Sequence, residues 1–383
     1  KGESMKLAIA QPYLTLMGGA EKVILKIAQH YDAKIYTIEY NKRTTFPEFR
    51  DLDIEIIGKK VPLAESLPYR ASQGLTYGYN FYNFKVGDDY DLINAHISPS
   101  EWIRHKNPRV LWYCHTPPRE VYDLYSIRSK GRSYKEKIIY ATFTRTYKFI
   151  MGGIIKKIEA IATNSSNTQG RISEYFSRHS TVINPGVDVS EYKNIDYERF
   201  FIYPSRIIPT KRQDYVIDAF AKFQRKAKGN MKLIIAGALS KDKEHVKYFN
   251  DLQAKGVKNV IFKINVADKE MRNMIARSSA VLFAAINEDF GMVPIEAMAS
   301  AKPVISVNEG GPKETIVDGK TGYLVNSVEE MANKMQFIAE HTDVAKELGK
   351  AGRKLVEKNY SWEAFFEKFD KIARRVANGE YIS

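Results

Sequence analysis

The sequence predicts two α/β domains, each a doubly wound parallel sheet with helices on both faces. The chain has 383 residues, more than one hydrophobic core usually organises. Short runs rich in Ile, Val and Leu alternate with longer amphipathic stretches, which is typical of parallel strands joined by crossover helices. This rhythm stops at residues 184–198, where Pro, Gly and charged residues interrupt it, and then begins again.

Six apolar runs of the first half are predicted as strands. The first of them, KLAIA, is followed by Gly18-Gly19 and by AEKVILKIAQHY, whose apolar residues recur at helical spacing. The strands are expected at residues 6–10, 33–40, 53–58, 91–96, 109–115 and 160–165.

The second half repeats the pattern with different residues. A helix is expected at residues 213–223, and a long amphipathic helix with an aromatic stripe at residues 361–376. Strands are expected at residues 200–205, 231–237, 259–264, 280–285 and 302–307. We therefore expect an N-terminal domain, a C-terminal domain and a final helix that packs back toward the first domain, with bounds 5–190, 191–360 and 361–383.

Charge and cysteine content narrow the class of protein. Lys and Arg number 59 against 45 Asp and Glu, a formal net charge of +14, which favours anionic partners. Nucleic acid, an acidic membrane face and phosphorylated substrates all qualify. Cys114 is the single cysteine, so an internal disulfide is excluded and a reducing compartment fits. No run approaches the roughly 20 apolar residues of a membrane-spanning helix and no secretory signal opens the chain, so we expect a cytoplasmic protein.

The stretch EDFGMVPIEAMASAKPVI, residues 288–305, crosses from a strand-end turn into a helix. A helix from about Val293 leaves the amides of Gly291, Met292 and Val293 without intrahelical partners. Free amides at the positive end of a helix attract a phosphate group. Glu288 in the turn is expected to accept from sugar hydroxyls, and Glu296 in the helix to hold a ribose diol. The alternative is a capping acid and a solvated helix acid, and the residues alone leave both open.

A second polar segment, SRIIPTKRQ, follows the first strand of the second half. Arg206 and Lys211 lie in it, between a strand and a helix. Two cations at such a crossing suit a diphosphate, because Arg offers a fork of donors and Lys a point charge. The alternative is that both are ordinary solvated loop residues.

Weaker signals come from glycines and histidines. Gly18 and Gly19 open a helix after the first strand and allow close approach of an anion, although the GxGxxG fingerprint is absent. GGPKE, residues 310–314, is a second such turn. His115 and His96 both end predicted strands, so the residues alone cannot decide which of them is functional.

Residues 128–157 combine basic and aromatic side chains. Nine Lys or Arg and one acid, Glu136, lie between Arg128 and Lys157. They are interleaved with apolar residues: Tyr134, Tyr140, Phe143, Tyr147, Phe149, Ile154 and Ile155. This mixture suits an anionic membrane surface, and the alternative is a core helix with a solvated basic face. Nucleic acid is disfavoured, because no helix-turn-helix, zinc-finger or RNP pattern is present.

Together these motifs resemble the retaining glycosyltransferases of group 1. Residues 288–296 resemble that family's signature of Glu, seven residues and Glu, and GGPKETIVDGKTGYLV continues its pattern. SRIIPTKRQDYVIDAF, NSSNTQGRISEYF, VINPGVDVSEY and MGGAEKVILKIA resemble further segments of the family. The resemblance covers most of the chain.

The resemblance implies the GT-B fold, in which two Rossmann-like domains face each other across a cleft. The N-terminal domain would take the acceptor and the C-terminal domain the nucleotide-sugar donor. Arg206 and Lys211 would grip the donor diphosphate, Glu288 with Phe290, Gly291, Met292 and Val293 would hold the sugar, and Glu296 the ribose. Gly18 and Gly19 would approach the phosphate or the acceptor, and His115 would contact the sugar. The expected catalytic residues are therefore Glu288, Arg206, Lys211 and His115.

The implied reaction moves a hexose to a hydroxyl of a glycan or lipid-linked acceptor, with retained configuration and without a metal or cofactor. WYCHTPPREVYDLY is most similar to family members that use GDP-mannose. A UDP-sugar-dependent transferase, a nucleotide-sugar epimerase and a non-catalytic binding module stay open. If residues 128–157 bind lipid, the protein is expected at the inner face of the cell membrane. The oligomeric state is not indicated.

Overall fold

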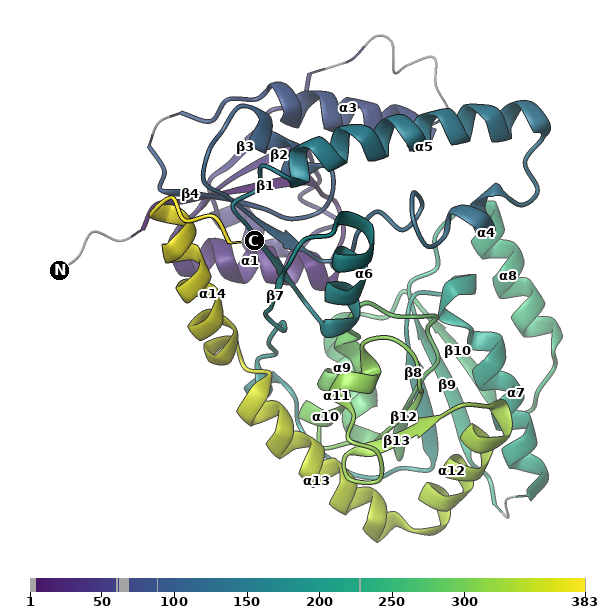
Figure 1. Cartoon of the computed structure of the whole chain (residues 1–383). Coiled ribbons are helices and arrows are strands. Elements are labelled where there is room, and N and C mark those ends of the chain that lie inside the picture. Colours follow the sequence, from purple (N-terminus) through teal and green to yellow (C-terminus); the bar gives the residue numbers. More distant parts are fainter. Residues whose placement is uncertain (1–4, 60, 62–68, 88, 227–228, 383) are drawn as a thin grey trace. The chain divides into compact units, whose positions relative to one another are not determined.

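The computed structural model describes residues 5–59, 61, 69–87, 89–226 and 229–382. The chain forms two compact units, each a doubly wound α/β sheet (Figure 1). Unit 1 comprises residues 1–184 and 366–383, and unit 2 comprises residues 185–365. The chain thus changes unit after Asn184 and after Phe365, a few residues from the expected positions 190 and 360.

Unit 1 is built on a seven-stranded parallel sheet in the order β3-β2-β1-β4-β5-β6-β7. Every residue of its three consecutive strands β4, β5 and β6 is buried, which explains their nearly continuous apolar sequences. The strands are β1 Leu7–Leu14, β2 Lys34–Tyr40, β3 Ile54–Ile56, β4 Leu92–Ala95, β5 Val110–Cys114, β6 Ala160–Thr163 and β7 Thr181–Val182.

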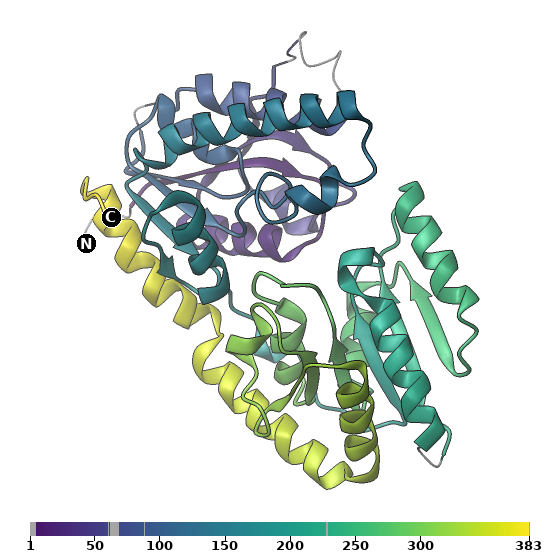
Figure 2. The same ribbon diagram turned by 45° about the vertical axis from the view of Figure 1, so that its right-hand side comes forward.

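Helices cover both faces of this sheet. α3 and α5 lie over one face and α1 over the other, as Figures 1 and 2 both show. The long α5 begins with a capping box, in which Ser133 and Glu136 satisfy each other's main-chain amides. The helices and 3-10 turns are α1 Gly19–Tyr31, η1 Pro47–Asp51, α3 Tyr69–Asn83, η2 Ser100–His105, α4 Tyr125–Ser129, α5 Tyr134–Ile155 and α6 Ser166–Phe176.

Unit 2 has a six-stranded parallel sheet in the order β10-β9-β8-β11-β12-β13. The strands are β8 Phe200–Pro204, β9 Lys232–Gly237, β10 Val260–Ile264, β11 Ala280–Phe283, β12 Val304–Val307 and β13 Gly322–Val325. The helices and 3-10 turns are η3 Val189–Glu191, η4 Pro209–Lys211, α7 Gln213–Lys226, α8 Lys243–Ala254, α9 Asp268–Arg277, α10 Met292–Ala299, α11 Pro312–Thr315, α12 Val328–Glu340, α13 Thr342–Asn359 and α14 Trp362–Ala377.

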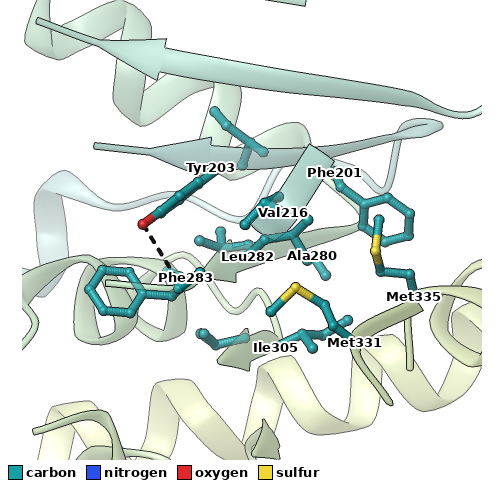
Figure 3. Close-up of a cluster of buried hydrophobic side chains, with 14 of the residues drawn as sticks. Phe201, Tyr203, Val216, Ala280, Leu282, Phe283, Ile305, Met331 and Met335 are labelled. Carbon is teal, nitrogen blue, oxygen red and sulfur yellow. Dashed lines mark hydrogen bonds between the residues drawn. The ribbon is translucent and has the colours of Figure 1, made fainter. Parts of the chain in front are cut away.

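The core of unit 2 lies between its sheet and the surrounding helices. Met331 and Met335, one turn apart on α12, are fully buried against strand side chains such as Phe201 and Ile305 (Figure 3). α14 leaves this unit, since from Phe366 onward it packs in unit 1, where Tyr31 donates to Asp370 at 2.5 Å.

The structure confirms every predicted strand and the helices expected at residues 213–223 and 361–376. Two strands were missed. β7 has only two residues, and the four of β13 include Gly322, so neither presents a continuous apolar run. β1 also continues to Leu14, four residues past the expected end. No helix among the described residues is long and apolar enough to cross a membrane.

Candidate active site

Three neighbouring strands of unit 2 deliver the predicted donor-site residues to one edge of the sheet. β8, β11 and β12 are adjacent and parallel, so the loops after them meet at their carboxyl ends. The β8 loop carries Arg206 and Lys211, the β11 loop carries residues 284–291, and the β12 loop carries Gly310-Gly311. Strand order therefore joins three segments that are far apart in the sequence.

Lys211 and Glu288 form an ion pair at this edge. Lys211 Nζ lies 2.5 Å from Glu288 Oε2, and the two side chains are 15% and 26% exposed. Tyr203, on β8, fixes the lysine's main chain, because its buried hydroxyl donates to the Lys211 carbonyl at 2.5 Å. The same hydroxyl accepts from the Ala284 amide at 3.4 Å, and Figure 3 shows it directed toward the end of β11 beside Phe283. The pair is thus held from both strands.

Arg206 presents its guanidinium differently. Its side chain is exposed, and no described residue forms a hydrogen bond or ion pair with it. Its carbonyl accepts from Gln213 Nε2 at 2.8 Å, and the same amide also donates to Ser205 Oγ at 2.9 Å. The main chain is anchored while the fork of five donors stays open to an anion.

The neighbouring Arg212 was not singled out in the sequence, yet it ties the site together. Its main chain is left-handed, with φ 49°, and its Nε donates to the Ala284 carbonyl at 2.6 Å. Its NH2 lies 2.9 Å from Glu309. Arg212 therefore connects the three loops. Of these two neighbouring cations, Lys211 is the candidate site residue and Arg212 has a structural role.

The predicted helix start is confirmed, with α10 beginning at Met292. Gly291 is the N-cap at φ 86°, a conformation that favours glycine, and as a glycine it offers no side chain to cap the helix. The N-terminal amides and helix dipole are thus placed in the loop that carries Glu288.

Gly310 and Gly311, in the loop after β12, pack against the main chain of the turn that carries Glu288. The Gly311 amide donates to the Glu288 carbonyl at 2.8 Å. A Cβ on Gly310 would lie 2.4 Å from the same carbonyl oxygen, and a Cβ on Gly311 would lie 2.3 Å from the Phe290 carbonyl oxygen. Only glycine permits this approach, which gives GGPKE a packing role in the site.

Side chains of the turn face the core more than the sequence indicated. Phe290 is 3% exposed and its ring centroid lies 5.9 Å from that of Tyr360, so only its main chain can reach a ligand. The half-buried side chains of Met292 and Val293 pack against the same core. Contacts from these three residues to a ligand would therefore come chiefly from main-chain groups.

Glu296 has a partner that the sequence did not indicate. The half-buried carboxylate is hydrogen-bonded to the hydroxyl of Tyr192, which is 4% exposed. Burial, followed by the Glu296 charge, raises the pKa of Tyr192, so the phenol stays protonated and donates. Tyr192 lies in VINPGVDVSEY, and no chemical motif distinguishes it from the many other tyrosines of the chain.

In unit 1, Gly18 is the N-cap of α1 and its main chain is extended, with φ −123° and ψ 174°. A Cβ at this position would lie 2.5 Å from Oε2 of Glu21, a buried acid in the first turn of the helix. Glycine here makes room for a carboxylate. Since a carboxylate already faces the start of α1, this turn is a poorer place for phosphate than the start of α10.

His96 and His115, which the residues alone could not rank, lie against each other. His96 Nδ1 and His115 Nε2 are 3.0 Å apart, with ring planes inclined by 26°. His96 is 1% exposed, whereas His115 is half-buried. Burial lowers the pKa of His115 to about 3, and burial, followed by electrostatic repulsion from the neighbouring His115, lowers the pKa of His96. Both rings are therefore neutral at physiological pH.

α5 has two distinct faces. Thr144, Tyr147, Met151, Ile154 and Ile155 are buried in unit 1. For Tyr147, Ile154 and Ile155 this agrees with the alternative of a core helix with a solvated basic face. The opposite face exposes apolar side chains among lysines and Arg145: Tyr134 (80% exposed), Ile138 (51%), Ile139 (61%) and Phe149 (84%). The side chain of Arg128 lies outside the described part of the chain.

Among the described residues, no group of three or more His, Cys, Asp or Glu side chains is arranged to hold a metal ion. Cys114 is buried and forms no disulfide.

Comparisons with known proteins fit this geometry. The family model of glycosyl transferases group 1 matches residues 189–372, which include the whole donor-site loop set. An alpha-1,3/1,6-mannosyltransferase ALG2 from Dictyostelium discoideum is 25% identical over 98% of this chain and 99% of its own length. A trehalose synthase from Pyrococcus horikoshii is 30% identical over 50% of this chain and 51% of its own length.

Solved structures share the fold. Anabaena HepE, solved in complex with UDP-glucose, superimposes with a TM-score of 0.74 at 19% identity, covering 97% of this chain and 99% of that chain. The Thermosynechococcus elongatus sucrose-phosphate synthase gives a TM-score of 0.77 at 18% identity, covering 98% and 100%. These matches assign residues 189–372 to the glycosyl transferases of group 1, and the chain as a whole shares the GT-B fold of the solved structures.

Proposed function

We propose that this glycosyltransferase is a retaining mannosyltransferase that uses GDP-mannose and acts on a glycan or lipid-linked acceptor. The observation that carries the proposal is the Lys211–Glu288 pair beside the start of α10. The choice of mannose draws support from the full-length likeness to the Dictyostelium mannosyltransferase.

In the proposed donor site, cations and amides meet the diphosphate and carboxylates meet hydroxyls. Lys211 carries three donors, so it can bond Glu288 and a phosphate oxygen at the same time. Arg206 supplies a second cation, a guanidinium to which no described residue is bonded. The start of α10 supplies main-chain amides. Glu288 binds hydroxyls of the sugar, and Glu296, steadied by Tyr192, binds the ribose.

The proposed reaction proceeds on one face of the sugar. The bond between the anomeric carbon and the diphosphate oxygen breaks, the acceptor oxygen bonds to the same face, and the acceptor proton passes to a phosphate oxygen. Negative charge grows on the leaving group, and Arg206, Lys211 and the amides would stabilise it there. One such preorganised donor is typically worth about 3–4 kcal/mol of barrier. Since these groups neutralise the diphosphate, we propose that no metal or cofactor takes part.

Glu288 is assigned to binding and not to covalent catalysis, because it is already committed to Lys211. A trapped glycosyl adduct on Glu288 would contradict this assignment.

Unit 1 is proposed to supply the acceptor side. His115 offers a neutral ring to the sugar. Gly18 and Gly19, with the Glu21 carboxylate, suit an acceptor hydroxyl better than a phosphate.

We further propose that unit 1 docks on an anionic membrane through the exposed face of α5. That face combines Tyr134, Ile138 and Phe149 with basic side chains on a helix whose other face is anchored in the core. The protein would then be cytoplasmic and peripheral at the inner face of the cell membrane.

The donor is tested first by thermal shift with GDP, UDP and ADP, and then by transfer from their sugars to a lipid-linked glycan. We expect GDP to stabilise most and GDP-mannose to be consumed only with acceptor. Stabilisation by UDP alone would indicate a UDP-sugar transferase. Isomerisation of the donor without acceptor would indicate an epimerase, and binding without turnover a regulatory module.

A further inference from the structure

His96 lies behind His115, at the ends of the neighbouring strands β4 and β5. Its amide donates to the Ala10 carbonyl at 3.1 Å and to Ser100 Oγ at 3.0 Å. Its carbonyl accepts from Trp112 Nε1 at 2.8 Å. The main chain is therefore held on three sides, and the buried ring is kept against His115.

Two neutral imidazoles whose nitrogens lie 3.0 Å apart have one proton between them. If His96 donates from Nδ1, His115 accepts at Nε2 and carries its own proton on Nδ1. If His115 donates from Nε2, its Nδ1 is a bare acceptor. The tautomer of His96 thus dictates what His115 offers at its other nitrogen.

The other ring nitrogen of His96, Nε2, decides between these two arrangements. Its Nε2 is buried and has no hydrogen-bond partner among the described residues. In the second arrangement that atom would be an unpaired N–H, whereas in the first it is an unpaired lone pair. Orphaned buried N–H groups are rarer in native structures than under-satisfied acceptors, and we take this to favour the first arrangement over the mild preference of free imidazole for the Nε2–H form.

We propose that His96 is a positioning residue that holds His115 as the Nδ1–H tautomer and so makes that nitrogen a fixed hydrogen-bond donor toward substrate. No described residue bonds Nδ1 of the half-buried His115. The group it meets is an oxygen acceptor, either a sugar hydroxyl or a phosphate oxygen. Only the identity of that oxygen rests on the proposed function; the tautomer itself does not.

The tautomer can be read without any substrate. Two-dimensional 1H–15N spectra that connect ring nitrogens with ring carbon protons assign the protonated nitrogen of each histidine, with His115→Gln and His96→Asn identifying the signals. We expect both rings to carry the proton on Nδ1. An Nε2–H signal for His115 would overturn the proposal even if the enzyme is fully active.

Substitutions at His96 then connect the tautomer with turnover. The Nδ2 of asparagine occupies the place of histidine Nδ1, so His96→Asn keeps a donor facing His115. His96→Asp puts an acceptor there, so His115 must donate from Nε2 and its Nδ1 loses the proton. We expect His96→Asn to retain most of the turnover and His96→Asp to lose about 10²-fold in kcat, the effect of losing one preorganised donor.

Comparing His96→Asn with His96→Asp separates positioning from structural support. Asn and Asp have the same size, so both variants lose the buried ring equally and differ only in whether a donor or an acceptor faces His115. His105→Asn is the matched control. His105, in η2, stacks on Tyr82 of α3 and does not contact His96 or His115 through a hydrogen bond. If His96→Asp flips the His115 tautomer yet turns over like His96→Asn, the proposal is wrong. If no variant, nor the parent chain, transfers sugar, the proposed function fails while the spectra still test the tautomer.

Discussion

The two units place functional side chains at the same structural position, the carboxyl ends of parallel strands, and use opposite chemistry there. Unit 2 presents an ion pair, an open guanidinium and a helix N-terminus. Unit 1 presents two neutral histidines, together with a carboxylate over the start of its first helix. In the proposed function the first set would stabilise a doubly charged anion, and the second set would bind uncharged hydroxyls. The difference teaches that the same fold can present opposite chemistry at its strand ends, and that local charge would decide which proposed role each unit takes.

The largest expected effect comes from the cations of unit 2. Lys211→Ala should lower kcat by about 10²–10³-fold, since one charge-stabilising donor is lost where charge develops. Lys241→Ala, an exposed lysine in the loop after β9, is the control for net charge and should leave kcat unchanged. Equal turnover in both variants would remove Lys211 from the site and the contrast between the units with it. Because Lys211 is largely buried beside Glu288, a modest loss of stability should accompany the loss of rate.

Unit 1 should show a pH dependence of stability that comes from Glu101. This fully buried acid accepts from Ser98 Oγ at 2.5 Å and faces Tyr122 and Tyr147, and burial raises its pKa from 4.5 to about 7. The folded state binds this proton more tightly than the unfolded state. Its stabilising effect is therefore complete below the unfolded pKa and is lost as the pH rises through about 7, by about 3 kcal/mol at most.

Melting curves of Glu101→Gln across this pH range test that assignment. The variant should gain on the parent chain as the pH rises, because the amide never ionises. Glu48→Gln, at an exposed acid of η1, should run parallel to the parent chain. A Glu101→Gln curve that also runs parallel would mean that the acid is ionised throughout, and the contrast of neutral unit 1 with charged unit 2 would weaken.

The glycine support of unit 2 predicts a smaller loss. Gly310→Ala forces a Cβ to within 2.4 Å of the Glu288 carbonyl oxygen at φ 62° and should destabilise unit 2 by about 1–3 kcal/mol. Gly319→Ala is the matched control, because Gly319 has φ 70° with nothing within 4 Å of the added Cβ. The difference between their melting temperatures isolates the close contact from the backbone strain. Equal losses would show that the turn moves freely and does not hold Glu288.

The smallest effect concerns the exposed face of α5. Lys137→Ala should weaken pelleting with anionic vesicles by about 1 kcal/mol, roughly fivefold, and the binding should fade as salt rises. Phe149→Ser should weaken it at all salt concentrations, because its apolar contact is not screened. Lys59→Ala, an exposed lysine elsewhere in unit 1, should bind like the parent chain. If the parent chain does not pellet at low salt, the membrane proposal fails and this face is solvated.

The sequence predicted some residues of the candidate site in unit 2 and missed others. Lys211, Glu288 and the start of α10 could be predicted because each lies in a motif with a local physical reason: a strand end, a proline in a first turn, a cation before a helix. Tyr192 and Arg212 could not, since tyrosine and arginine are common and only the packed chain shows what they contact. The inward direction of Phe290 was missed for the same reason.

By itself the sequence determined the two α/β units, nearly all of their strands, and the loops that bear the site, because apolar periodicity and turn chemistry are local properties of the chain. Only the tertiary structure decided which of these loops meet, through the adjacency of β8, β11 and β12. It also decided that Lys211 pairs with Glu288 and that His96 backs His115. The physical reason is that pairing and burial depend on neighbours far apart in the chain, and burial sets whether a side chain is charged or neutral.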